Sequence, residues 1–145
     1  MSWKTKPLFL SIFLLAAFLL LEEFYFYVLG IEMPESFIEF MLAEPILLGF
    51  ISVVVVAPII EEFLFRGFLY SQLRRSFLKD WGAVTVSSLV WTAIHFQYEV
   101  GILFFLFLFG LFLGYFRIKY NSLLIPIALH AVNNLIAFIL IIYLP

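Results

Sequence analysis

Long apolar segments follow one another along this chain, and they limit its possible folds more than any other feature. We distinguish five of them, over roughly residues 8–29, 46–70, 82–97, 101–117 and 123–144. About 20 apolar residues are enough to cross a bilayer as a helix, and a helix satisfies its own backbone hydrogen bonds in lipid. We therefore expect an all-α fold, a polytopic transmembrane helical bundle of about five spans.

The composition agrees with a membrane protein and excludes several other classes. The sequence is 66% hydrophobic and 12% charged, whereas a soluble domain is about half apolar and about a quarter charged. It has no cysteine, which excludes disulfides, thiol nucleophiles and cysteine metal ligands. We expect a single transmembrane domain over residues 1–145, with its motif-bearing core at residues 46–144.

The charges between the apolar segments predict an orientation. Basic residues lie at alternate ends of the segments: Lys4, Lys6, Arg74, Arg75, Lys79, Arg117 and Lys119. The other connections carry acidic residues and no basic ones: Glu32, Glu35, Glu39, Glu44 and Glu99. The positive-inside rule then places the N-terminus in the cytoplasm and the C-terminus outside. The first segment lacks a small-residue cleavage site, so we expect it to be an uncleaved span.

The acidic connection 31–45 has two possible structures. It carries large apolar residues between its charges, namely Phe37, Ile38, Phe40, Met41 and Leu42. Such a pattern can form a short amphipathic helix on the outer membrane surface. A plain loop is an equally good interpretation.

A small set of polar side chains interrupts the apolar segments. It consists of the charges in "APIIEEFLFRGFLY", two histidines and two amides: Glu61, Glu62, Arg66, His95, His130, Asn133 and Asn134. Ionisable groups at such positions are costly in lipid and are functional-site candidates. Counted at 1.5 Å per residue, Glu61, His95, His130 and Asn134 lie roughly 14–20 Å from the cytoplasmic ends of their helices. Three helices therefore bring polar groups to a similar depth, which predicts a single site.

The spacing of these residues predicts which of them face one another. Residues four apart share a helix face, so Glu62 and Arg66 can form an ion pair, and His130 and Asn134 point together. Glu61 is offset from Glu62 by about 100° and can face the bundle centre. Taken one at a time, these residues also have structural interpretations as a neutralised pair, a packing histidine and interhelical hydrogen bonds.

Several hydrolytic chemistries lack their sequence signatures here. The zinc motif H-E-x-x-H is absent, Asp80 is the only aspartate, and no Gly-x-Ser-x-Gly elbow is present. What remains is Glu61 as a general base helped by histidine, with amide and imidazole donors for an oxyanion. Alternatively, Glu61, His95 and His130 can hold a divalent metal through one carboxylate and two imidazoles.

Three short motifs occur in order over residues 57–138. They are "EEFLFRG", "WTAIH" and "HAVNN". They resemble the motifs Glu-Glu-x-x-x-Arg, Phe-x-x-x-His and His-x-x-x-Asn of the CAAX prenyl protease and bacteriocin-processing (CPBP) intramembrane endopeptidase family. Trp91 stands where the second motif has phenylalanine, so an aromatic side chain is retained one turn from His95.

The resemblance implies an intramembrane endopeptidase that hydrolyses a peptide bond in a membrane-anchored or lipidated protein or peptide. Glu61 and His95 would activate water, and His130 and Asn134 would stabilise the oxyanion. The remaining two motif residues would organise the site, namely Glu62 and Arg66. Both metal-dependent and glutamate-dependent mechanisms have been described for the family. We favour a reaction that needs no cofactor, with zinc bound by Glu61, His95 and His130 as the alternative.

The partners expected for such a protein are a membrane-anchored substrate and the lipid bilayer. No basic cluster of the kind that binds nucleic acid is present. We expect a multi-pass integral membrane protein, in the prokaryotic cell membrane. Two other functions are a non-catalytic membrane immunity or binding protein and a small transporter. A transport path would spread ionisable groups along the membrane normal, whereas these groups gather at one depth.

Overall fold

The computed structural model describes residues 5–43 and 45–143, and the regular structure in these residues is entirely helical. The expected all-α fold is therefore confirmed. Lys4 and Glu44, used above to predict the orientation, and residue 144 at the end of the expected core lie outside the described residues.

The helices follow the apolar segments closely. Helix α1 spans Thr5–Leu29 and α2 spans Glu35–Ala43. A continuous helix follows, made of α3 (Ile46–Phe50), η1 (Ile51–Val56), α4 (Ala57–Glu62), η2 (Phe63–Leu69) and α5 (Tyr70–Leu73), in which η1 and η2 are π-helical. The remaining helices are α6 (Lys79–Ala93), α7 (Val100–Tyr120) and α8 (Leu124–Tyr143).

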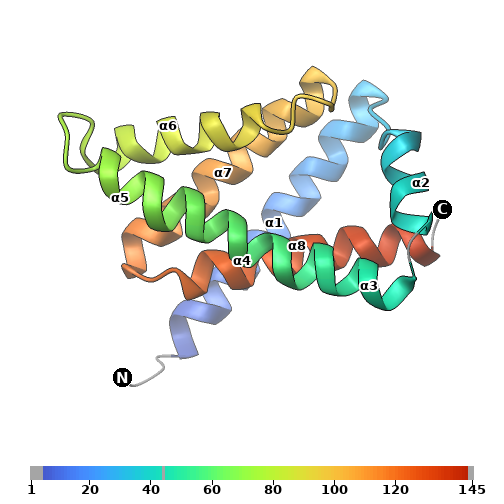
Figure 1. Cartoon of the computed structure of the whole chain (residues 1–145), viewed down its shortest axis with the longest axis horizontal. Helices are drawn as coiled ribbons and strands as arrows, with labels where there is room; N and C mark the ends of the chain where they lie inside the picture. The colour runs from blue at the N-terminus through green and yellow to red at the C-terminus, as the bar shows by residue number, and fades with distance from the viewer. Residues whose placement is uncertain (1–4, 44, 144–145) are drawn as a thin grey trace.

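Two pairs of helices enclose the middle of the molecule. Helices α6 and α7 form an antiparallel hairpin, and the continuous helix packs along α8 through η1 and α4 (Figure 1). Helix α1 contacts α7 and α8. The largest core cluster lies among α1, η2, α6, α7 and α8, and contains Leu15, Phe65, Trp91, Phe109, Leu113, Phe116 and Leu129.

Within the described residues, four helices are long and apolar enough to cross a membrane: Leu10–Leu29, Ile46–Leu73, Val100–Tyr120 and Leu124–Tyr143. The protein is thus a helical membrane bundle. The segment expected at 82–97 is α6, whose 15 residues are not among these four. The number of spans and the cytoplasmic N-terminus stay predictions.

Helix α6 ends earlier than the sequence suggested. It stops at Ala93 because the chain must reverse before α7 begins at Val100. The turn is closed by backbone hydrogen bonds from the His95 N–H to Thr92 O, and from the Tyr98 N–H to His95 O. His95 therefore lies in this turn, which corrects the expectation that both histidines are inside spans.

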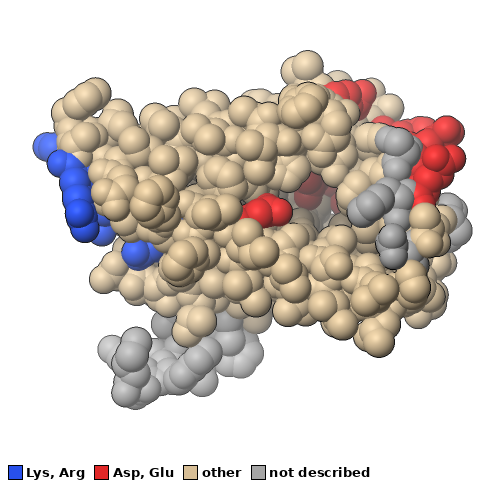
Figure 2. Space-filling model, in the orientation of Figure 1, with Lys and Arg blue, Asp and Glu red and all other residues tan. Residues whose placement is uncertain are grey.

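The acidic connection contains a helix, α2, rather than a plain loop. Met41 on α2 is buried against Val54, Phe138 and Ile141 from η1 and α8. On the face shown in Figure 2, the basic side chains lie at the end nearest the α5–α6 connection, and the acidic ones lie mostly toward the end nearest α2, with one acidic area near the middle. This separation is the pattern on which the predicted orientation depends.

Helices α6 and α7 approach closely because α7 presents two glycines to α6. A Cβ atom added to Gly110 would lie 2.8 Å from Ser88 Cβ, and one added to Gly114 would lie 3.2 Å from Val84 Cβ. The Gly114 Cβ would also collide with both methyl groups of Val84. Gly110 and Gly114 lie one turn apart on α7, and such a spacing of small residues allows two helices to pack closely.

We predict that Gly114→Ala destabilises the protein by about 1–3 kcal/mol, because the added methyl group overpacks the interface with Val84. Thermal or denaturant unfolding in detergent measures this loss. The matched control is Gly49→Ala, whose new Cβ would meet its nearest atom, on Phe138, at 3.4 Å. Combining Gly114→Ala with Val84→Ala should recover part of the lost stability, because the smaller side chain makes room for the new methyl group. No recovery in the double variant would contradict the overpacking explanation.

Candidate active site

A buried ion pair lies at the centre of the site. Glu62 ends α4, and Arg66 lies one turn later in η2; their exposed fractions are 0% and 1%. Arg66 Nη1 donates to Glu62 Oε1 over 2.9 Å, and Arg66 Nη2 donates to the Gly110 carbonyl over 3.1 Å. The predicted pair is confirmed, and it connects the continuous helix to α7.

The same carboxylate also determines which nitrogen of His130 carries a proton. His130 Nδ1 is 3.0 Å from Glu62 Oε1, and a carboxylate paired with arginine can only accept a hydrogen bond. His130 Nδ1 must therefore donate. Its other nitrogen, Nε2, lies 3.9 Å from Glu61 Oε2. This separation exceeds a direct hydrogen bond but allows a bridging water.

Glu61 is the more open of the two adjacent acids. Its side chain is 22% exposed, whereas that of Glu62 is fully buried. The indole Nε1–H of Trp91 donates to Glu61 Oε2 over 2.6 Å. Trp91 is 1% exposed, and its hydrogen bond to Glu61 was not predicted from the sequence. The available signal was the indole itself, because a buried Trp N–H usually needs an acceptor.

His95 reaches the site from the turn after α6. Its Nδ1 donates to the Trp91 carbonyl over 2.9 Å, since a carbonyl can only accept. Its ring is edge-on to Trp91 at 5.1 Å and stacked on Tyr98 at 6.1 Å. Burial raises the pKa of the Tyr98 phenol. Among the described residues, no hydrogen bond or ion pair joins His95 to Glu61.

Asn134 lies one turn after His130 on α8 and faces η1. Its Nδ2 donates to the Val53 carbonyl over 2.9 Å, and its Oδ1 accepts from Asn133 Nδ2 over 3.4 Å. The contact with Val53 ties α8 to the continuous helix. An amide nitrogen carries two N–H groups, so one remains for another acceptor.

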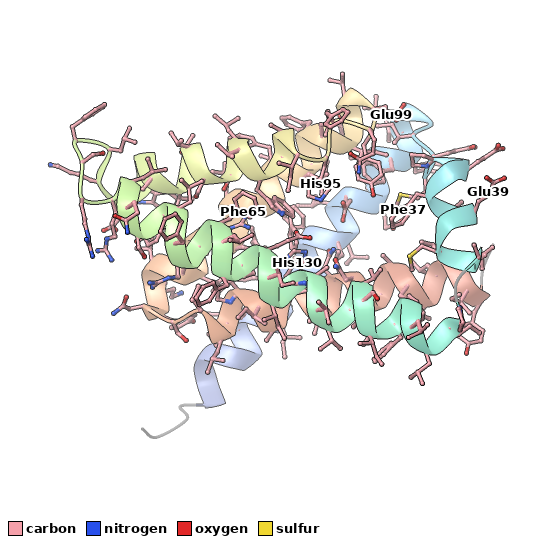
Figure 3. All side chains as sticks on the ribbon, in the orientation of Figure 1. Phe37, Glu39, Phe65, His95, Glu99 and His130 are labelled. Atoms are coloured by element: carbon pink, nitrogen blue, oxygen red, sulfur yellow. The ribbon has the colours of Figure 1, made fainter. Side chains whose placement is uncertain are left out.

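Side chains from three parts of the chain therefore meet around Trp91. Figure 3 shows His95 and His130 approaching the middle of the bundle from opposite sides. Trp91 lies edge-on to both imidazoles, with His130 at 5.5 Å, and donates to Glu61. Figure 2 shows acidic surface near the middle of this face, beside a hollow that lies toward the acidic end.

The proposed metal ligands are not arranged as a ligand set. In the described part of the chain, no group of three or more His, Asp or Glu side chains is placed to hold a metal ion. Glu61 Oε2 and His130 Nε2 lie 3.9 Å apart, but among the described residues no hydrogen bond or ion pair joins His95 to either of them. The described side chains, as placed, therefore do not form a three-ligand zinc site.

Comparison with known proteins identifies the family. Residues 43–136 match the family described as type II CAAX prenyl endopeptidase Rce1-like, and the chain belongs to this family. Over 87 residues it is 34% identical to a protein of Escherichia coli named "Uncharacterized 24.3 kDa protein". That match covers 59% of this chain and 40% of the relative's length. No solved structure matches the chain.

We predict that Glu62→Gln lowers the free energy of unfolding by about 3–5 kcal/mol, because it leaves the charge of Arg66 buried without its partner. Denaturant unfolding in detergent measures this loss. Arg74→Gln is the control, since Arg74 pairs with Asp80 at 3.0 Å with both side chains 41% exposed. Such a surface pair contributes at most about 1 kcal/mol. Equal losses of unfolding free energy in the two variants would contradict the claim that Glu62→Gln leaves a buried charge without its partner.

Proposed function

We propose that the protein is an intramembrane endopeptidase, which hydrolyses a peptide bond in a membrane-anchored or lipidated protein or peptide. One observation carries the proposal: a partly exposed carboxylate, Glu61, lies beside a histidine whose orientation is set by a buried ion pair. Family membership and the hollowed face support the same function. The site is proposed to lie within a prokaryotic cell membrane.

In the first step, Glu61 acts as the general base. Its Oε2 accepts the Trp91 N–H, and its Oε1 has no hydrogen-bond partner among the described residues. We propose that Oε1 takes a proton from a water molecule. The oxygen of this water then attacks the substrate carbonyl carbon. His95, whose Nδ1 donates to Trp91 O, keeps a lone pair on Nε2 and helps to orient this water.

The attack produces a negatively charged oxygen that requires hydrogen-bond donors. Asn134 offers its second N–H group, and His130 is the other proposed donor. With Nδ1 already donating to Glu62, His130 can donate from Nε2 only when that nitrogen also carries a proton. Its Nε2 lies 3.9 Å from Glu61 Oε2. In the proposed mechanism Nε2 carries its proton before water attacks and keeps it throughout, so the proton taken from water stays on Glu61.

In the last step, the proton that Glu61 took from water passes to the leaving group. Glu61 donates the proton to the amide nitrogen as the carbon–nitrogen bond breaks. The products are a new carboxyl group and a new amine, and Glu61 is again a carboxylate. Glu62 and Arg66 take no proton in this sequence. They hold the backbone and His130 in position.

We predict that Glu61→Gln and His130→Ala each reduce peptide-bond hydrolysis at least about a hundredfold, because each removes a proton acceptor or an oxyanion donor. Purified wild-type and variant proteins are compared by mass spectrometry on membrane-anchored and lipidated peptides. The control is Glu99→Gln, an exposed acid outside the site.

Retained hydrolysis in folded Glu61→Gln would contradict the assignment of Glu61. Circular dichroism and unfolding curves establish that each variant is folded. A binding or immunity protein would behave differently, because the wild type would bind a partner without cleaving it.

We also predict that wild-type hydrolysis continues after exhaustive treatment with a metal chelator, because every proposed proton transfer uses protein side chains. Activity is measured before and after dialysis against the chelator. Loss of activity that added zinc restores would contradict this mechanism and favour a metal held by Glu61, His95 and His130.

A further inference from the structure

We propose that Trp91 is the positioning residue of the site, and that its indole N–H fixes which oxygen of Glu61 acts as the base. This inference rests on the proposed function, because the orientation of Glu61 matters only if Glu61 takes a proton from water. It gives a role to Trp91, which is not one of the catalytic residues of the proposed mechanism.

The hydrogen bond itself is short and partly buried. It joins Trp91 Nε1 to Glu61 Oε2 over 2.6 Å, between side chains 30 residues apart in sequence. Trp91 is 1% exposed, whereas the Glu61 side chain is 22% exposed. One oxygen is therefore held by a buried donor, which leaves the other for the substrate side.

The Trp91 ring also contacts the other groups of the site. It lies edge-on to His95, with ring centres 5.1 Å apart, and edge-on to His130 at 5.5 Å. The Arg66 guanidinium carbon lies 4.9 Å from the ring centre, a cation–π contact. A single rigid side chain thus contacts the proposed base, both imidazoles and the buried arginine.

The ring is held in place independently of these contacts. Trp91 belongs to the core cluster formed with residues such as Phe65, Phe109 and Leu129. Its rotation would disrupt this packing, so its N–H has a fixed direction. A carboxylate without such a donor rotates about its last torsion, which is broad and has no strong preference.

Phenylalanine at this position would retain an aromatic ring but no donor. We expect Trp91→Phe to lower kcat roughly ten- to a hundredfold while KM changes little, because misplacing a catalytic group mainly affects the chemical step. A residue that only fills the core would instead lower stability, and the remaining folded enzyme would keep its kcat.

The decisive variant changes the N–H group and preserves the shape. Trp3→Phe and Trp81→Phe together leave Trp91 as the sole tryptophan, since the chain contains three. Growth with β-(3-benzothienyl)alanine then replaces the indole N–H by sulfur at residue 91 alone. The expected result is a folded protein that shows the same loss of kcat as Trp91→Phe. Full kcat in the sulfur analogue would overturn the proposal.

A second measurement detects the hydrogen bond without using activity. The indole ¹H–¹⁵N resonance of Trp91 in the full chain in bicelles is compared between the wild type and Glu61→Ala. Loss of the carboxylate acceptor should shift this resonance upfield. The Trp81 resonance is the control and should stay unchanged, because Trp81 is 56% exposed and stacks on Tyr115.

The two measurements separate failure of this inference from failure of the proposed function. An active wild type whose Trp91 resonance does not respond to Glu61→Ala would overturn the positioning role alone. A wild type that cleaves no membrane-anchored peptide would contradict the proposed function and, with it, the positioning role. Loss of kcat in the sulfur analogue together with the resonance shift is the result that the proposal requires.

Discussion

An arginine buried in an apolar helix must have its charge balanced inside the protein, and much of this site depends on how that is done. Glu62 supplies the opposite charge, and the Gly110 carbonyl accepts a second hydrogen bond from the guanidinium. The absence of a side chain at Gly110 allows this approach, since a Cβ there would lie 3.1 Å from Arg66 Nη2. The pair therefore joins two helices and also holds His130 through Glu62.

The pair explains why the chain carries two adjacent glutamates. Successive helical residues point in directions about 100° apart, so the two carboxylates enter different environments. Glu62 is enclosed with Arg66 and His130, whereas Glu61 accepts a hydrogen bond from Trp91 and is 22% exposed. One acid thus supports the structure, and the other is left for chemistry in the proposed mechanism.

Much of the fold and part of the site could be predicted from local sequence patterns. The apolar segments, the Glu62–Arg66 spacing and the glycines of α7 each depend on neighbours within one or two helical turns. The end of α6 before His95 could not be predicted, because it depends on how sharply the hairpin must reverse. The Trp91–Glu61 and Asn134–Val53 bonds join residues 30 and 81 positions apart, so only tertiary packing determines them.

The central claim is that the buried pair fixes the orientation and proton position of His130. The ¹⁵N chemical shifts of histidine in the full chain in bicelles test it most directly. A His95→Asn variant leaves His130 as the sole histidine of the chain and assigns its signals. The account predicts a proton on Nδ1 of His130 in the resting protein. A neutral ring with its proton on Nε2 and a bare Nδ1 would contradict it.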